Sequence, residues 1–543
     1  MKRRRHVRNG RNVRHGRRSG RRERKELIRA KDPVRESALG IKSRLKAAGL
    51  NERFSGDLEK EAAAIASRKV TEADFRGRRD LRGQLIITID GADSKDLDDA
   101  ISLGETENGD YVLGVHIADV SEYVKMRSPL DEEAMERGNS VYFLDRVIPM
   151  LPKTISNGIC SLFEGTPRLT LSCEMVIDRS GNIVSHDIYP SVIESKARMV
   201  YDDVSDMIEY GDEGLISVYS DKNGENVYEA LLKMNELACI LHDKRIREGS
   251  VDFDLDEAVI ELGPDGIPTD VGVLDRRCAN RMIEEFMLAA NRTVAKHFRE
   301  RKAPFIYRVH AKPESDKVRQ LQEFLAGTGV SLKGKGGSVT SAELNRILDS
   351  VRGSDNEKVV ATVMLHAMSK AYYSTDPLGH YGLGFRDYCH FTSPIRRYPD
   401  LMIHRIIKAI LSGRSNDRTL AKYARYCDAA AEHSSVTEKN AMSLERDIED
   451  IKKAEYMSMH VGEQFDGVIS GVTSFGVFVE LPNTIEGLIH VRNLGDERFL
   501  FHEDKYILTG SSTGRTYKLG DPIRITVKEA RVYEGKIEFL PAD

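Results

Sequence analysis

Paired cysteines and long apolar runs are both missing from this sequence. The cysteines are scattered, without any Cys-x-x-Cys pair: Cys160, Cys173, Cys239, Cys278, Cys389 and Cys427. This spacing argues against a zinc site or a disulfide framework and favours a reducing compartment, so we expect a cytoplasmic protein. No apolar run approaches the roughly 20 residues of a membrane span, and none follows the basic N-terminus. We therefore expect neither a membrane span nor a secretory signal.

An even distribution of charge is also missing. The formal net charge is only −4, but residues 1–30 carry 14 Lys and Arg against two acids, which gives this segment +12 and leaves −16 on the rest. The segment has almost no large apolar side chains, so we expect a disordered Arg-rich arm that binds nucleic acid through counter-ion release. The alternative interpretation is a non-native leader, for instance from a truncated or mis-started reading frame.

The 543 residues, 40% of them hydrophobic, suffice for more than one domain. We expect an α+β protein: a mostly helical connector at 31–84, a large mixed α/β domain at 85–458, and a small five-stranded barrel of the OB type at 460–541. In the large domain the pattern predicts strands at 86–89, 111–117 and 169–177, helices at 226–248, 279–300, 358–373 and 400–411, a Gly-rich loop at 333–338 and a long helical region at 418–459. The barrel strands are predicted at 464–469, 476–480, 487–490, 522–528 and 536–539.

Acidic residues concentrate in one short run, TIDGADSKDLDDA at 88–100. The predicted strand delivers Asp90 to a Gly-broken loop that also carries Asp96, Asp98 and Asp99. Hard oxygen ligands gathered in this way suit Mg²⁺ or Mn²⁺, ions that also engage phosphate oxygens. A solvated acidic turn is the alternative interpretation. The run does not match a calcium-binding EF-hand loop, which needs Gly at its sixth and Glu at its twelfth position.

Two further motifs favour a nucleic-acid phosphate as the substrate. The run TSPIRRYPD at 392–400 places Arg396 and Arg397 in a loop stiffened by two prolines, and guanidinium groups match phosphate oxygens. Tyr142, in the run SVYF at 140–143, is suited to stacking on a base. An ordinary salt-bridged loop and a core aromatic are the respective alternatives.

The predicted barrel carries aromatic residues that suit single-stranded nucleic acid. Phe475, Phe478 and His490 on one barrel face would form a stacking platform. The alternative is that at least one of these aromatic residues belongs to the barrel core.

Several ordered motifs together resemble a known family. The acidic run, HIADVS at 116–121, PMLP at 149–152 and the Arg396 loop are similar to the RNB catalytic domain of the ribonuclease II/ribonuclease R superfamily. The runs SVYF at 140–143 and SNGICSL at 156–162 look more like ribonuclease R, and the C-terminal barrel resembles an S1 RNA-binding domain. The resemblance covers about residues 75–540.

The resemblance implies a monomeric, processive 3′→5′ exoribonuclease that acts in RNA decay and quality control. It would hydrolyse single-stranded RNA from its 3′ end to nucleoside 5′-monophosphates, with Mg²⁺ as cofactor and Mn²⁺ able to substitute. On this pattern the metal lies among Asp90, Asp96, Asp98 and Asp99. Asp96, Asp98 and Arg396 are the catalytic set, with Asp98 the most rate-critical.

The same pattern assigns RNA-binding roles. Tyr142 would stack on the 3′-terminal base, Arg396 would contact the scissile phosphate, and Glu445 would meet the leaving nucleotide. Arg397 and the barrel residues Phe475, Phe478 and His490 complete the RNA-binding set.

The sequence also departs from the pattern, because ribonuclease R usually carries two cold-shock OB domains before its catalytic domain. Here about 75 residues precede the match, and no long Lys-rich tail follows the barrel. The alternatives are therefore a non-hydrolytic RNA-binding protein or a truncated fragment with impaired RNA access.

Overall fold

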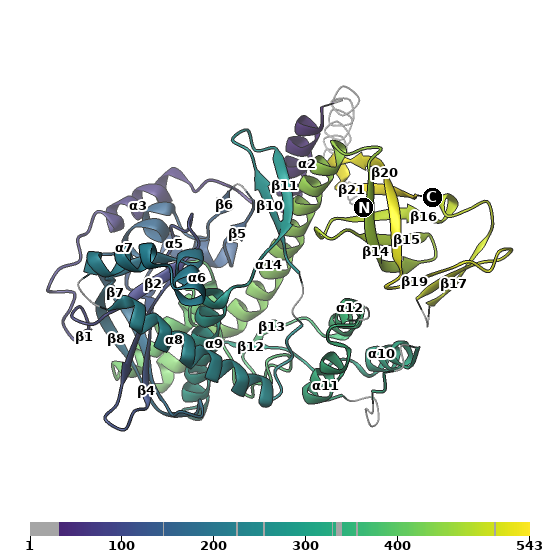
Figure 1. The fold of residues 1–543 in the computed structure, drawn as a ribbon. Coiled ribbons are helices and arrows are strands. Elements are labelled where there is room, and N and C mark those ends of the chain that lie inside the picture. The colour runs from purple at the N-terminus through teal and green to yellow at the C-terminus, as the bar shows by residue number, and fades with distance from the viewer. Residues whose placement is uncertain are drawn as a thin grey trace, which may run out of the picture.

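The computed structural model describes residues 32–144, 146–223, 226–253, 256–327, 330–332, 339–354, 357–503 and 506–542. The predicted Arg-rich arm and the Gly-rich loop at 333–338 lie outside these described residues. The described chain forms a large mixed α/β part and a small barrel, linked by one long helix, which confirms the predicted fold class (Figure 1).

A seven-stranded sheet forms the centre of the large part, in the order β1-β8-β7-β4-β3-β2-β9. Its strands are β1 (Arg79–Asp80), β2 (Ile87–Asp90), β3 (Asp99–Glu105), β4 (Tyr111–Ala118), β7 (Pro167–Ile177), β8 (Ile183–Glu194) and β9 (Ala197–Val200). The pairs β1–β8 and β2–β9 are parallel, and the other neighbouring pairs are antiparallel. The β-branched run before Asp90 forms β2 because Ile87 and Ile89 are buried.

Helices pack on this sheet and around it. One face is covered by α6 (Tyr201–Tyr210), α7 (Glu213–Asn223), α8 (Val227–Arg247) and α9 (Cys278–Glu300) (Figure 1). In α9 a fully buried residue recurs every fourth position, at Phe286, Ala290, Val294 and Phe298, which is the apolar stripe of a core-facing helix. Further helices are α2 (Pro33–Ala47), α3 (Gly56–Ala66), α4 (Val120–Tyr123), α5 (Pro129–Arg137), α13 (Tyr398–Leu411) and a π-helical turn at Ile155–Ile159.

Smaller elements surround this core. Three helices, α10 (Ser315–Gly327), α11 (Ser341–Val351) and α12 (Glu357–Ala367), share a hydrophobic cluster, against which Tyr506 and Leu519 also pack. Three two-stranded sheets are β5 (Val141–Tyr142) with β6 (Val147–Ile148), β10 (Ala258–Leu262) with β11 (Pro268–Val273), and β12 (Tyr307–Val309) with β13 (Tyr372–Ser374).

The 42-residue helix α14 (Asp417–Ser458) runs from the large part to the barrel (Figure 1). The barrel closes in the order β14-β15-β16-β21-β20, through β14 (Gln464–Thr473), β15 (Gly476–Glu480), β16 (Glu486–His490), β20 (Pro522–Arg531) and β21 (Lys536–Pro541). The five predicted barrel strands are thus confirmed. An unpredicted sheet of β17 (Phe499–His502), β18 (Ile507–Gly510) and β19 (Thr516–Lys518) is inserted between β16 and β20.

The helix predicted at 358–373 is wrong at its C-terminal end. Helix α12 stops at Ala367, and Tyr372–Ser374 forms β13 against β12 instead. Tyr373 is buried there, and its backbone N–H donates to Ser435 Oγ of α14 at 2.9 Å. Tertiary pairing therefore overrides the local helical pattern.

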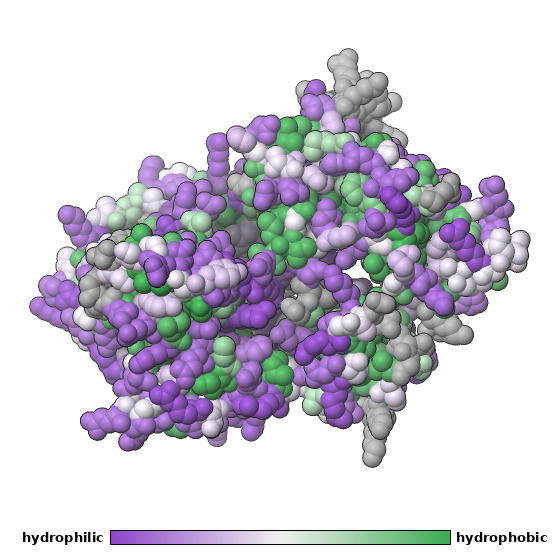
Figure 2. All heavy atoms as spheres, in the orientation of Figure 1, coloured by the Kyte–Doolittle hydropathy of each residue, from purple (hydrophilic) through white to green (hydrophobic). Residues whose placement is uncertain are grey.

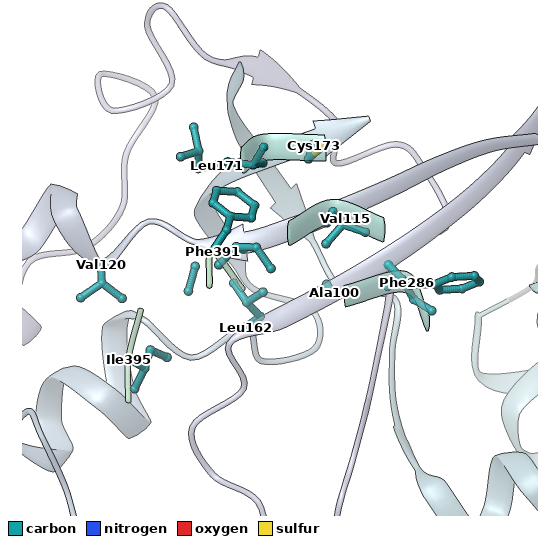
Figure 3. Close-up of a cluster of buried hydrophobic side chains, with 14 of the residues drawn as sticks. Ala100, Val115, Val120, Leu162, Leu171, Cys173, Phe286, Phe391 and Ile395 are labelled. Carbon is teal, nitrogen blue, oxygen red and sulfur yellow. The ribbon is translucent and has the colours of Figure 1, made fainter. Parts of the chain in front are cut away.

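One continuous apolar core spans the sheet and the helices packed against it. Figure 3 shows Phe391 and Ile395, from the loop before α13, among Val120, Leu162 and Leu171 of other elements. This anchors the Arg396 loop in the core of the large part. Most of the face shown in Figure 2 is hydrophilic, with apolar side chains gathered near the β10–β11 hairpin. No helix among the described residues is long and apolar enough to cross a membrane.

Candidate active site

The aspartates of the acidic run meet at one end of the central sheet. Strand β2 ends at Asp90, and β3 begins at Asp99 in the antiparallel direction, so Asp98 and Asp99 return to the end of β2. Together with Asp96 they line a cavity of about 570 Å³ that also contains Tyr142, Arg396 and Arg397. This volume falls within the range of small-molecule sites, roughly 300–1,000 Å³, and thus accommodates one nucleotide.

The loop between β2 and β3 is held from both sides. Arg198 of β9 donates from Nη2 to the carbonyl oxygens of Ala92 and Ser94, at 3.0 and 2.8 Å. Ser161 accepts from the Leu97 backbone N–H at 3.1 Å and donates to the Lys95 carbonyl at 2.9 Å. The aspartate side chains are therefore presented by a fixed backbone.

Asp98 is the most buried of the four carboxylates, with 3% of its surface exposed. Its Oδ1 accepts a hydrogen bond from the Ile395 backbone N–H at 2.9 Å, and its Oδ2 lies 3.6 Å from Arg396 Nε. The acidic run and the Arg396 loop, almost 300 residues apart in sequence, thus make direct contact.

Negative charge is confined in this cavity. Burial raises the pKa of Asp90 to about 8, with Asp99 and Asp96 adding to the increase and Arg198 and Arg396 opposing it. Burial raises the pKa of Asp99 to about 6, and it also raises the pKa of Asp98 well above its ordinary value although Arg396 opposes this. Near neutral pH the cluster therefore favours binding of either protons or a cation.

The two arginines of the predicted loop have different surroundings. Arg396 Nη2 donates to Ser393 Oγ at 2.9 Å, and its side chain is 42% exposed in the cavity. Arg397 Nη2 instead donates to the buried Asp400 at 2.7 Å, and its side chain is 17% exposed. Arg396 is thus the arginine more accessible to a ligand.

Tyr142 connects the aspartates to α14. Its hydroxyl donates to Asp96 Oδ2 at 3.1 Å, and its backbone N–H donates to Glu445 Oε1 at 2.9 Å. The residue is 37% exposed, so part of the ring is accessible to a ligand. A smaller cavity of about 200 Å³, lined by Tyr142, Arg396, Arg397 and Glu445 among others, adjoins the first.

Several cavity residues were not predicted. Tyr201 follows Val200, the register partner of Asp90 on β9, and the other additions include Glu284, Met287, Asn291 and Tyr388. Asn291 is buried, and its Oδ1 accepts from the Phe391 backbone N–H at 2.8 Å. The strand before Tyr201 was not predicted, and the helix α9 carried no motif, so no signal in the sequence pointed to these residues.

The barrel aromatics lie on the barrel and do not line the aspartate cavity. Phe475 is 47% exposed and meets Phe478 edge to face, with ring centroids 6.0 Å apart. His490 pairs with Gly476 across β15 and β16, and its Nδ1 accepts from the Arg492 backbone N–H at 3.3 Å. Phe475, Phe478 and His490 thus all lie on or next to the paired strands β15 and β16.

The donor set fits a hard divalent cation. Among the described residues, Asp90 Oδ2 and Asp98 Oδ2 are buried carboxylate oxygens without a hydrogen-bond partner. In the described part of the chain, no group of three or more His, Cys, Asp or Glu side chains is arranged to hold a metal ion. Mg²⁺ is usually held by one or two carboxylates, with water and substrate phosphate completing its shell, so the two unpartnered carboxylate oxygens agree with such an ion.

The sequence from β1 to the end of α13 matches a known family. The RNB domain covers residues 78–413, which is more than half of the chain. The chain belongs to the RNB family. The S1 RNA binding domain matches residues 458–540, so the barrel of this RNB protein is an S1 domain. Ribonucleases of the RNB family depend on a metal ion.

Relatives of this RNB protein are similar over most of its length. Ribonuclease R 1 of Lactococcus lactis is 44% identical over 492 residues, covering 90% of this chain and 59% of that protein. Ribonuclease R of Thermotoga maritima is 42% identical over 491 residues, covering 90% of this chain and 68% of that protein. The chain therefore spans about three fifths to two thirds of the length of these two relatives.

A solved structure shares the fold. Mycoplasma genitalium RNase R in complex with ribose methylated single-stranded RNA has a TM-score of 0.88 and 29% sequence identity. The match covers 93% of this chain and 78% of that chain, so both the RNB part and the S1 barrel have counterparts.

Proposed function

We propose that this RNB protein is a processive 3′→5′ exoribonuclease that hydrolyses single-stranded RNA to nucleoside 5′-monophosphates. The observation that carries the proposal is the convergence of Asp90, Asp98, Asp99 and Arg396 on one cavity beside Tyr142. Carboxylates for a cation, a guanidinium for phosphate and an aromatic ring for a base are the groups that such a reaction needs.

The carboxylates would hold the metal. Mg²⁺, or Mn²⁺ in its place, bound among Asp90, Asp96, Asp98 and Asp99 would neutralise phosphate charge and lower the pKa of a bound water. The raised pKa of Asp90, about 8, means that its carboxyl retains a proton near neutral pH before a cation binds. Metal affinity should therefore increase with pH, because the cation competes with that proton.

The remaining residues would position the RNA. The hydrogen bond from Ile395 fixes the Asp98 carboxylate, and the adjacent Arg396 would contact oxygens of the scissile phosphate as their charge increases. The accessible ring of Tyr142 would stack on the 3′-terminal base, and Glu445 of α14 would contact the leaving nucleotide. Arg397 would contribute less directly, because Asp400 already accepts from its guanidinium.

The S1 barrel would hold RNA upstream of the cavity. Exposed Phe475, together with Phe478 and His490, would stack on bases without sequence preference. RNA held at both places could advance after each cut, which is the physical basis of processivity. We further propose that the protein acts on RNA 3′ ends as a monomer in the cytoplasm.

A labelled-RNA assay tests this proposal. Wild-type protein and Asp98→Asn are incubated with 5′-labelled poly(A) and Mg²⁺, and Asp93→Asn serves as control because Asp93 is exposed in the same loop. Wild type and Asp93→Asn should give a descending ladder, which EDTA abolishes. Asp98→Asn should be slower by on the order of 10²-fold or more. RNA binding without shortening by the wild type would instead show a non-hydrolytic RNA-binding protein and overturn the proposal.

A further inference from the structure

Helix α2 lies outside both family matches, at 78–413 and 458–540, and yet it contacts both matched parts of the chain. In Figure 1 it lies beside α14 close to the barrel. Asp32 caps its N-terminus by accepting from the Val34 backbone N–H, so the helix begins at a defined position. Its contacts fall on two separate faces.

The first face touches one turn of the S1 barrel, Val532–Glu534. Arg44 donates from Nη1 to the Tyr533 carbonyl at 2.6 Å and from Nη2 to the Glu534 carbonyl at 3.2 Å. A Cβ added at Gly40 would lie 3.1 Å from the Tyr533 carbonyl oxygen, so the two backbones approach closely. Gly40 and Arg44 are four residues apart and lie on one side of the helix.

The second face of α2 packs behind the RNA-binding residues of the large part. Ile41 and Leu45 contact a cluster formed by Val141 of β5 and by Leu444 and Ile448 of α14. Val141 directly precedes Tyr142, and Leu444 directly precedes Glu445. The helix therefore supports the backbone segments that carry Tyr142 and Glu445.

We infer that α2 is a positioning element that sets the S1 barrel relative to the Tyr142–Glu445 pair. The barrel also meets the large part through α14, through the β10–β11 hairpin and through the α10–α12 cluster, against which Tyr506 and Leu519 pack. Of these contacts, those of α2 reach both the barrel turn and the cluster behind Tyr142 and Glu445. Contacts along α2 brace this connection, and RNA that occupies both the barrel and the cavity needs a constant distance between them. The inference rests on the proposed function, because it concerns RNA that spans these two places.

Removal of the Arg44 side chain provides the main test. Arg44→Ala loses both hydrogen bonds to the barrel turn, whereas Lys46→Ala removes the same charge from an exposed position of the same helix. For a long unstructured RNA, Arg44→Ala should raise KM by roughly tenfold with little change in kcat, since hydrogen bonds from a charged group are lost. A trinucleotide, which reaches only the cavity, should be hydrolysed as by wild type. Arg44→Lys should restore part of the loss, and Lys46→Ala should behave as wild type.

Two glycine substitutions test the close approach of α2 to the barrel turn without changing any charge. Gly40→Ala and Gly56→Ala each replace a helical glycine with a better helix former, so neither should lower the melting temperature through propensity. No atom lies within 4 Å of a Cβ at Gly56, whereas the Cβ at Gly40 would lie 3.1 Å from both the Tyr533 carbonyl oxygen and Ile451 Cδ1 of α14. Gly40→Ala alone should therefore weaken binding of long RNA, by about threefold, because the barrel turn must shift.

Binding in EDTA separates this inference from the proposed function. The dissociation constants of long RNA and of the trinucleotide are measured without hydrolysis for the wild type, Arg44→Ala and Lys46→Ala. A selective loss of long-RNA affinity in Arg44→Ala supports the positioning role even if the wild type cuts nothing. Unchanged long-RNA affinity, or an equal loss for both ligands, would overturn it.

Discussion

Replacing Asp90 by asparagine should stabilise the metal-free protein. Asp90 ends β2 facing Asp96 and Asp99, and its Oδ2 is buried without a hydrogen-bond partner among the described residues. The amide has nearly the same shape and no charge, and its NH₂ group can donate to a neighbouring carboxylate. We therefore expect a higher melting temperature for Asp90→Asn than for the wild type in EDTA at pH 8.

The magnitude follows from the pKa of Asp90. An increase from 3.8 to about 8 corresponds to ~6 kcal/mol between the two protonation states, at ~1.4 kcal/mol for each pKa unit. Water and salt cations enter the cavity, and Asp99 and Asp96 still repel each other in the variant. The expected gain is therefore about 1–3 kcal/mol, or a rise of roughly 2–6 °C in the melting temperature.

The sign of the pH dependence is also determined. The folded protein binds a proton at Asp90 more tightly than the unfolded chain does. The stability from this proton is fully present below pH 3.8 and is lost as the pH rises to about 8. The advantage of Asp90→Asn should accordingly be small near pH 4 and largest near pH 8.

Mg²⁺ should reverse the order of the two melting temperatures, so that the wild type becomes the more stable protein. A ligand that binds only the folded state at 100 times its Kd stabilises by about 2.7 kcal/mol. Mg²⁺ should stabilise the wild type by this amount, whereas it should stabilise Asp90→Asn by only a small part of it. Differential scanning fluorimetry at pH 5 and pH 8, with EDTA or Mg²⁺, measures all these differences. A lower melting temperature for the variant in EDTA at pH 8, or an equal Mg²⁺ response of both proteins, would refute the reasoning.

Substitutions at three further positions test the large part and the barrel. Burial alone would raise the pKa of Asp119, but Lys408 and Arg78 lower this pKa far below its ordinary value. Asp119→Asn should therefore destabilise the folded protein by about 3–5 kcal/mol near neutral pH, and the stability of the wild type should decline only at acidic pH. Unaltered thermal unfolding of the variant would contradict this. Tyr142→Ala should weaken binding of single-stranded RNA by about 1–3 kcal/mol while Tyr142→Phe retains most affinity, and an equal loss in both would exclude stacking. Phe475→Ala should weaken the binding of long RNA by a similar ~1–3 kcal/mol and leave the binding of a trinucleotide unaffected. A loss of affinity for both ligands would show a misfolded barrel.

The elements with strong local patterns were predictable from the sequence. The acidic run was expected to follow a strand, and Asp90 indeed ends β2. The long helix at 418–459 was expected nearly where α14 lies, because the segment is dense in Ala, Glu, Lys and Arg, which favour helices. Barrel strands β14, β15 and β16 were also expected, since Gly and Asn mark the turns between them.

Elements that depend on distant partners could not be predicted. Strands β17 to β19 contain only three or four residues each, and they form because they pair with one another and pack on the barrel core. Among the site residues, Asn291 lies in the cavity because α9 crosses the sheet there, which no local pattern reveals. The aspartates and Arg396 were predictable as a set only through the order of the motifs. Their metal-binding and catalytic roles stay predictions.

The hydrogen bond from Ile395 to Asp98 joins positions that are 297 residues apart, and the one from Tyr142 to Glu445 joins positions 303 apart. At ~5–20 residues per second, a ribosome needs roughly 15–60 s to proceed from Asp98 to Ile395. During that interval the aspartates have already left the peptidyl transferase centre, but the arginine and the backbone donor do not yet exist. A chain that ends before Ile395 therefore lacks both the backbone donor and the arginine that contact Asp98.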